Sequence, residues 1–303
     1  MIVRSRPNGI ALLLAMRGSV LPIIAPRLAL VLAIAVVAVA VHQAWPGHFP
    51  QISPAPFTLL GLGVSIFLGF RNNACYERWW EGRKQWGALV SISRALLRDI
   101  ATLLPEPDSA LKRRAAARVA AFAHALRDQL RDAPPAPAAD WLPAGGQTRL
   151  NARRNRALLV QQIQAEEFTA LYRQGALSDI LLTRLCAHLD AMTAIQAACE
   201  RLRNTPLPFA YSLMLHRSVW LFCLILPFAM VDSLNIVTPV LSLVLAYAFL
   251  GLDALGEELE EPFGQTANAL PLDAMVRAIE ISAAEAQGEA PPPPLAPRDF
   301  VLL

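Results

Sequence analysis

The stretch that decides the fold is FTLLGLGVSIFLGFRNNACYERWWEGRKQWG, residues 57–87. It begins with a predominantly apolar segment of 14 residues, 57–70, and continues into a charged, aromatic segment with no proline. Because proline is the strongest helix breaker, its absence predicts one continuous helix through residue 101. The apolar half would rise only about 21 Å, short of the roughly 30 Å hydrocarbon core of a bilayer. This favours a helix that other helices surround and that lines water, over a lipid-facing helix.

Small residues recur along the apolar half at helical spacing. Gly61, Ser65 and Gly69 follow one another at i, i+4 and i+8, so they share one helix face. Rows of small residues let helix backbones approach closely inside a membrane. The pattern therefore predicts a close-packing stripe on this helix.

The neighbouring row is bulky and apolar. Leu62, Ile66 and Phe70 have the same spacing. If several copies pack around an axis, these side chains form stacked apolar rings, and such constrictions can gate a pore by dewetting. The same spacing also fits ordinary buried or lipid-facing positions.

The distribution of charge divides the chain into membrane and soluble parts. Hydrophobic residues make up 55% of the 303 residues and charged residues 17%, below the usual quarter of a soluble domain. Lys and Arg are absent from residues 28–70 and 218–276, whereas 21 of the 27 lie within residues 71–217. The positive-inside rule predicts that this basic block is cytoplasmic. A net charge of +3 without a basic, aromatic-interleaved run argues against nucleic-acid binding.

Hydropathy predicts four spans and hence both termini in the cytoplasm. The spans are residues 28–45, 57–70, 218–231 and 236–252, and the polar joint 232–235 turns the last two into a hairpin. The domains follow: an N-terminal interfacial segment (1–27), spans one and two (28–70), a cytosolic helical domain (71–217), spans three and four (218–252), and a cytosolic C-terminal segment and tail (253–303). A cleaved signal peptide is the alternative for the first span, since residues 38–40 read Ala-Val-Ala. The long, proline-containing region before it favours a retained segment.

Three amphipathic helices are predicted in the soluble part. They cover residues 111–131, 151–173 and 178–203, with Gly175 as a hinge and Ser178 or Asp179 as a cap. The proline-rich tail, residues 284–303, is expected to be disordered or a loose strap.

Three motifs together resemble the signature of the bestrophin family of ion channels. The first is RNNACYERWWEGR, residues 71–83; the others are TPLPFAY at 205–211 and EPFG at 261–264 with LPLD at 270–273. The resemblance implies an all-α membrane protein, a homopentamer with the second helix lining the pore. It also implies that Ile180, which sequence alone would treat as a first-turn core residue, narrows the cytosolic exit.

The polar half of the long helix is predicted to form a structural junction between membrane and cytosol, although a solvated helix fits the same charges. Its residues are Arg71, Asn72, Asn73, Tyr76, Glu77, Arg78, Trp79, Trp80, Glu81 and Arg83. A membrane enzyme built on this region and His216 is the alternative. No nucleophile, phosphate loop or GxSxG elbow accompanies these residues, so no enzyme is predicted.

No metal site or cofactor is expected from the spacing of residues. The five His and four Cys are dispersed, without HExxH or C-x-x-C spacing. The acidic run in residues 253–261 fits a solvated helix end, a cation-attracting vestibule or a calcium site. Animal bestrophins carry an acidic calcium-binding run after the Pro-Phe-Gly, whereas residues 265–269 here read QTANA. A calcium cage is therefore doubtful, because its oxygen ligands are missing.

The function predicted from these observations is a passive ion channel in a bacterial inner membrane, in contact with lipid and with permeant monovalent ions. An aliphatic neck beside acidic segments favours Na⁺ or K⁺. A chloride or other anion channel of the same fold is the alternative, and a secondary transporter is the second alternative. A transporter usually shows an inverted repeat, and none is evident here.

Overall fold

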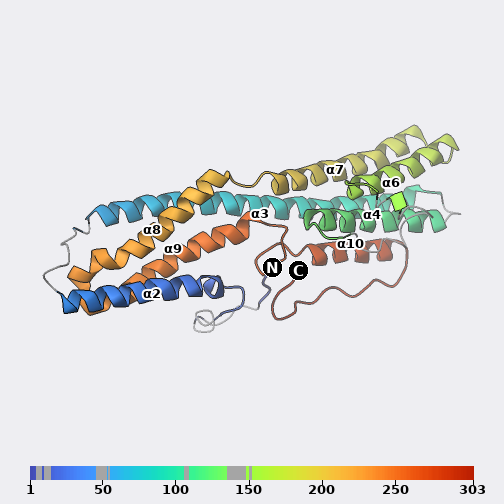
Figure 1. The fold of residues 1–303 in the computed structure, drawn as a ribbon. Helices are drawn as coiled ribbons and strands as arrows, with labels where there is room; N and C mark the ends of the chain where they lie inside the picture. Colours follow the sequence, from blue (N-terminus) through green and yellow to red (C-terminus); the bar gives the residue numbers. More distant parts are fainter. Residues whose placement is uncertain are drawn as a thin grey trace. The chain divides into compact units, whose positions relative to one another are not determined.

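The computed structural model describes residues 1–4, 9, 15–45, 53, 55–105, 109–134, 148–149 and 152–303. Within these residues the regular structure is helical, apart from isolated bridges at the two chain ends, so the all-α prediction is confirmed. The helices (Figure 1) are α2 (Leu21–Ala44), α3 (Ala55–Leu103), α4 (Ser109–Leu130), α6 (Arg156–Arg173), α7 (Asp179–Asn204), α8 (Phe209–Leu234), the 3₁₀ turn η1 (Asn235–Val237), α9 (Thr238–Glu260) and α10 (Leu272–Ala286).

The chain forms two compact units. The apolar unit contains Arg4–Trp79 and Pro206–Glu261; the charged unit contains Met1–Val3, Trp80–Thr205 and Pro262–Leu303. These divisions lie 9 to 12 residues from the hydropathy boundaries at 70/71, 217/218 and 252/253. The difference arises because α3, α8 and α9 continue past their apolar segments and pair through polar side chains. The assignment of the parts to membrane and cytosol stays a prediction.

The long helix is continuous, as predicted. α3 runs for 49 residues through both the apolar and the charged halves of the deciding stretch. Three helical stretches among the described residues are long and apolar enough to cross a membrane, namely Leu21–Ala44, Ala55–Leu103 and Phe209–Glu260, the last made of α8, η1 and α9.

Two helices begin before the spans predicted from hydropathy. α2 begins at Leu21, ahead of the span at residue 28, since Pro22 occupies the first turn, where its missing N–H has no helical partner to lose. α8 begins at Phe209, ahead of the span at residue 218. The hairpin turns at η1, after the predicted joint, and Asn235 takes the positive φ of 45° that this turn requires.

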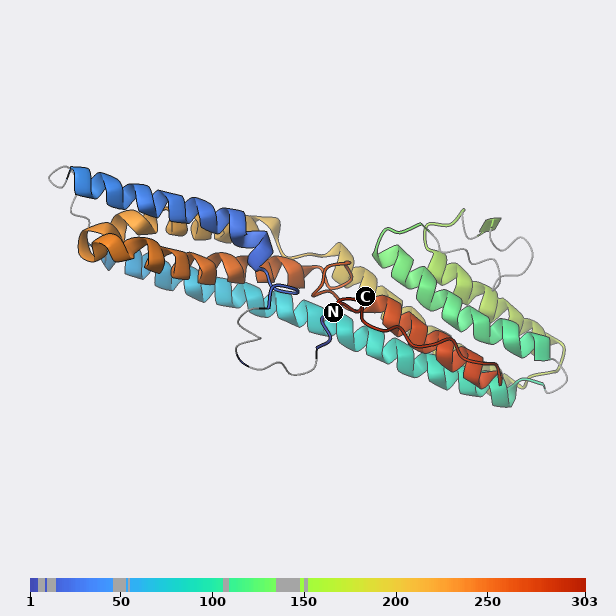
Figure 2. The ribbon, with the colours of Figure 1, turned by 90° about the horizontal axis from the view of Figure 1, so that it is seen from below.

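The apolar unit is held together by one core that all four of its helices supply. Ile24, Leu28 and Val31 of α2 meet Val64 and Leu68 of α3, and α8 and α9 add Val219, Phe222, Cys223, Leu226, Ala246, Leu250 and Ala254. Figure 2 shows α2 alongside α9 within this unit. Because the core lies on one side of each helix, bulky apolar side chains on the other sides remain exposed.

The charged unit packs α4, α6, α7 and α10 with the second half of α3. Trp86, Phe122, Phe168, Leu185 and Ile279 are fully buried in it. The predicted cap at Ser178 is confirmed, since its Oγ accepts from the N–H of Leu181 (3.3 Å), and Gly175 takes φ 74° at the hinge. α6 begins at Arg156 instead of residue 151, because Asn155 accepts from the N–H of Leu158 (3.0 Å) and caps it there.

The two chain ends pair within the charged unit. The N–H of Val3 donates to Phe300 O (2.8 Å), and that of Leu302 donates to Met1 O (2.9 Å). Figure 2 shows the two ends close together. The tail after α10 is thus a strap, not a free segment. The proline-rich sequences at residues 46–56, 105–108 and 133–146 predict a turn, a helix break and a loop, and these segments fall largely outside the described residues.

Candidate functional site

The four apolar side chains predicted to narrow a pore are all exposed in the single chain. Leu62, Ile66 and Phe70 on α3, and Ile180 on α7, have between 48% and 75% of their surface accessible. Such exposure is what a ring of copies around an axis would cover, and equally what lipid would cover. Their role in a pore remains a prediction.

The small-residue row divides into two environments. A Cβ on Gly61 would lie 3.0 Å from the ring of Phe222, whereas a Cβ on Gly69 would meet nothing within 4 Å. Between them, Ser65 Oγ donates to Gly61 O at 2.7 Å and satisfies its hydroxyl within the helix. Gly61 therefore packs inside one chain, whereas the exposed Gly69 is free to pack against another chain.

Arg71 carries the most consequential contact of the signature motif. Its Nη1 lies 2.7 Å from Oδ1 of Asp253 on α9, and both side chains are buried. Its Nη2 lies 3.7 Å from Oε2 of Glu260. A guanidinium buried in an apolar unit requires such partners, because an isolated charge there is strongly destabilising. Sequence reasoning recognised Arg71 but missed Asp253, whose partner is far away along the chain.

Glu260, which directly precedes the third motif, contacts residues of the first and second sequence motifs. Its Oε1 accepts from the N–H of Leu207 (3.1 Å), in the motif that precedes α8. Its backbone carbonyl accepts from Nε and Nη2 of Arg78 (3.4 Å each). The first and second motifs, which lie far apart in sequence, therefore meet at the end of α9.

The remaining junction residues are mostly at the surface. Tyr76 and Trp79 stack with ring centroids 6.3 Å apart, and Trp80 is half-exposed. Glu81 binds Lys84 Nζ and Gln85 Nε2, each at 2.6 Å, on its own helix. Asn73 and Glu77 are exposed, and Asn72 and Arg83 are partly buried. The packed network thus centres on Arg71 and Arg78, whereas Asn73, Tyr76, Glu77 and Trp80 lie on an exposed face.

Gly82, in the first motif, lies against the third motif, which follows α9. A Cβ on Gly82 would lie 3.1 Å from side-chain atoms of both Phe263 and Leu270. Leu270 N–H also donates to Pro262 O (2.8 Å) and closes the turn of residues 262–270. This turn packs on α3 at Gly82, where the absence of a side chain leaves room for Phe263 and Leu270.

A cationic cluster lies one helical turn from Ile180. Asp99 on α3 is buried and accepts from Arg184 Nε (2.7 Å), His188 Nε2 (2.9 Å) and Arg98 Nε (3.1 Å). Arg184 follows Ile180 at i+4, so the two side chains share one face of α7. Two guanidiniums share one carboxylate here, so the cluster keeps a net positive charge. The charges were visible in the sequence, but their convergence on Asp99 was not.

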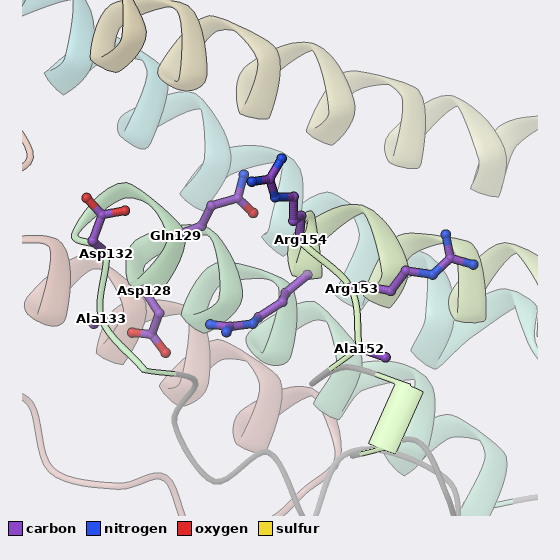
Figure 3. Close-up of a pocket in the computed structure, with 8 residues that line it drawn as sticks. Asp128, Gln129, Asp132, Ala133, Ala152, Arg153 and Arg154 are labelled. Carbon is purple, nitrogen blue, oxygen red and sulfur yellow. The ribbon is translucent and has the colours of Figure 1, made fainter.

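A polar pocket of about 370 Å³ lies where α4 ends and α6 begins, within the charged unit. Figure 3 shows Asp128, Gln129 and Asp132 on one side of it and Ala152, Arg153 and Arg154 on the other. Arg127 holds Asp128 (2.6 Å), and Arg203 holds Asp132. No Ser, Cys or His is among the described residues that line it, so it offers charge without a nucleophile.

The cysteines of α7 are chemically quiet. Burial, and less strongly the carboxylates of Glu200 and Glu81, raises the pKa of the Cys199 thiol to about 12. Burial also raises the pKa of Cys186, with a smaller contribution from Asp190. Thiols held protonated are poor nucleophiles and poor metal ligands.

One histidine does meet carboxylates in the apolar unit. Nδ1 of His216 on α8 lies 2.7 Å from Oδ2 of Asp253 and 3.7 Å from Oε1 of Glu257 on α9. Spacing along the chain could not reveal this cluster, because it depends on how α8 packs against α9.

Comparison with known proteins identifies a family that this chain matches over most of its length. The model of the family described as "Bacterial/Fungal Bestrophin protein" matches residues 1–285. The voltage-dependent anion channel-forming protein YneE of Escherichia coli is 44% identical over 96% of this chain and 95% of its own. A voltage-dependent anion channel-forming protein of Mesorhizobium japonicum is 41% identical over 99% and 96%.

Solved structures agree with the sequence comparison. The crystal structure of a bacterial bestrophin homolog from Klebsiella pneumoniae superposes with a TM-score of 0.84 at 39% identity, over 88% of this chain and 100% of that one. A crystal structure described as that of a membrane protein superposes equally well, with 38% identity. By its sequence motifs, its helical fold and its matched length, this chain belongs to the bacterial and fungal bestrophin family.

Proposed function

We propose that this protein is a passive ion channel that conducts anions such as chloride. The observation that carries the proposal is its match, over nearly the whole length of both chains, to relatives named voltage-dependent anion channel-forming proteins. The cation selectivity expected from the sequence has no such support, and the anion alternative becomes the main proposal. A catalytic role is not part of it, since those names describe channels.

The charge around Ile180 supports anion conduction. Arg184 is half-exposed and lies one turn from Ile180, anchored to Asp99. If Ile180 narrows the exit, copies of Arg184 would surround the same opening with guanidiniums, which favour anions in pores. Asp179 also lies there, but its carboxylate accepts from the N–H of Ile180 (2.9 Å) at the positive end of the α7 dipole.

The acidic residues that had favoured cations are partly neutralised. Asp253 and Glu260 share the guanidinium of Arg71, which offsets part of their combined negative charge. The aliphatic part of the neck, Leu62 and Ile66, is neutral toward either sign of charge. The argument for cations is therefore weaker, because part of the acidic charge near α9 is offset by Arg71.

The proposed assembly is a homopentamer in a bacterial inner membrane, in contact with lipid, with α3 lining the pore. Four spans within α2, α3, α8 and α9 would leave both termini in the cytoplasm. Leu62, Ile66 and Phe70 would form the neck, and dewetting there would set the conducting state. Calcium gating is not part of the proposal, because residues 265–269 offer no carboxylate.

The reversal potential of the purified protein in a planar bilayer under a KCl gradient tests the proposal. An anion channel reverses near the chloride Nernst potential, with discrete openings. Reversal near the potassium potential would restore the cation prediction and overturn the anion proposal. Slow, saturable tracer flux without discrete openings would favour a transporter.

A further inference from the structure

We propose that His216, Asp253 and Glu257 form a binding site for a first-row transition-metal dication such as Zn²⁺, where α8 and α9 meet. Nδ1 of His216, Oδ2 of Asp253 and Oε1 of Glu257 carry the proposal, and all three ligand atoms lie within 4.8 Å of one another. One imidazole nitrogen and two carboxylate oxygens are a ligand set that zinc accepts, with water in the fourth position.

The distances suit a small dication. Two ligand atoms of a tetrahedral zinc lie about 3.3 Å apart, given metal–ligand bonds of about 2.0–2.1 Å. The observed separations from His216 Nδ1, 2.7 Å to Asp253 and 3.7 Å to Glu257, lie on either side of this value. Small side-chain rotations would therefore bring the three atoms around one metal.

The helices already orient two of the three ligands. Asp253 and Glu257 are four residues apart on α9, so they project from one face. His216 stands opposite on α8, and its ring meets Trp220 edge-on with centroids 6.4 Å apart. The three residues therefore come from two packed helices instead of a loop, which limits the entropy lost on binding.

Asp253 also has the outer contact that metal-binding carboxylates usually have. Its Oδ1 is held by Arg71 Nη1 at 2.7 Å, which leaves Oδ2 directed at His216. A second hydrogen bond of this kind fixes the orientation of a ligating carboxylate. The local charge also suits a dication: the ligands Asp253 and Glu257 carry two negative charges and Glu260 a third, whereas Arg71 and Arg78 supply two positive charges beside them.

The choice of metal follows from the ligands. An imidazole nitrogen suits zinc, cobalt, nickel or copper, whereas calcium requires six to eight oxygens and magnesium keeps several waters. Both His216 and Glu257 are partly exposed, so a hydrated ion can reach them. A metal here would cross-link α8 to α9 beside the Arg71 contact. Metal binding would therefore also affect how α3, the proposed pore helix, packs against α9.

Metal titration of the tag-free, full-length protein in detergent tests the site. With Co²⁺ as the probe, we expect a visible ligand-field band that saturates at one ion per chain and that Zn²⁺ displaces. His216→Ala and Glu257→Gln should each weaken binding at least about tenfold, since even outer contacts of a metal site contribute that much. Glu261→Gln is the control, because it removes one negative charge nearby but outside the cluster.

Three results would overturn the site. They are no saturable binding to wild type, unchanged affinity in both variants, or an equal loss in Glu261→Gln, which would mean surface charge alone. Circular dichroism checks folding, and if His216→Ala does not fold, Glu257→Gln at the exposed edge decides. Binding is measured without ion flow, so failure of the anion-channel proposal leaves this test intact.

Discussion

Nη1 of Arg71 lies 2.7 Å from Oδ1 of Asp253, although the two residues are 182 positions apart in the chain. This buried pair holds α3 against α9. Replacing Asp253 with Leu leaves the guanidinium buried without its main partner, so we expect a loss of about 3–5 kcal/mol of stability. Thermal melting in detergent measures the effect as a lower Tm.

The double variant Arg71→Met with Asp253→Leu is the matched control. It removes both charges, so most of the lost stability should return. Glu261→Gln should leave the Tm unchanged. If Asp253→Leu alone melts like wild type, the pair does not hold the two helices together.

The neck is tested by truncation. Changing Leu62, Ile66 and Phe70 together to Ala should widen and wet a constriction formed by their side chains, and single-channel conductance should rise severalfold. Phe67→Ala is the control, since Phe67 is equally exposed on α3 but lies outside the row. Wild-type conductance from a normally assembled triple variant would place the limiting gate elsewhere.

The two outer glycines of the small-residue row should respond differently. Gly61→Leu drives a side chain into the ring of Phe222, so we expect a loss of about 1–3 kcal/mol and a lower Tm. Gly69→Leu has open space within the chain and should leave its secondary structure intact, while light scattering shows a smaller oligomer. Unchanged oligomer mass in Gly69→Leu would remove that face from the proposed interface.

Arg184 is expected to favour anions at the opening that Ile180 narrows. Arg184→Gln removes a unit charge whose interaction with a passing ion is about 1 kcal/mol in a solvated opening. We therefore expect the anion-to-cation permeability ratio to fall about fivefold. Arg98→Gln is the matched control. Arg98 also binds Asp99, but it lies on α3 and not next to Ile180 on α7. Equal shifts of the reversal potential in both variants would assign the effect to Asp99 and not to the position of Arg184.

Stability in acid should depend on Glu280. The hydrogen bond from His124 (2.6 Å) holds the pKa of Glu280 below its usual value, and Arg277 adds to the effect. A carboxyl group with a lowered pKa stabilises the fold above its unfolded pKa, and this contribution is lost as the pH falls through the folded pKa. Glu280→Gln should therefore lower the Tm at pH 7, and its effect should shrink as the pH falls below about 4, the usual pKa of a glutamate. A Tm difference that is the same at pH 7 and well below that pKa would contradict this.

Several features of the protein follow from the sequence by itself. The proline-free run from residue 57 predicts one long helix, because nothing in it interrupts the hydrogen-bond ladder. The absence of Lys and Arg from residues 28–70 and 218–276 separates apolar from charged segments. The signature around Arg71 identifies the family, because its rare residue types follow one another in a contiguous stretch that can be read without knowing the fold.

Helix starts were less predictable, because proline has opposite effects at different positions. Pro22 precedes the span predicted from hydropathy, yet in a first turn it fits the helix. Residues 209–217 are more polar than the span that follows, but α8 includes them, since backbone hydrogen bonds continue wherever packing supports them.

Only the tertiary structure decided which charges meet. Asp253 looked like one more acid of a solvated run, and it became the buried partner of Arg71 when α9 packed against α3. Asp99 gathered Arg98, Arg184 and His188 from two helices, and His216 reached Asp253 and Glu257 across the α8–α9 contact. Periodicity states which face of a helix a residue occupies, but not which other helix covers that face. The partners of buried charges therefore emerge only when the helices pack.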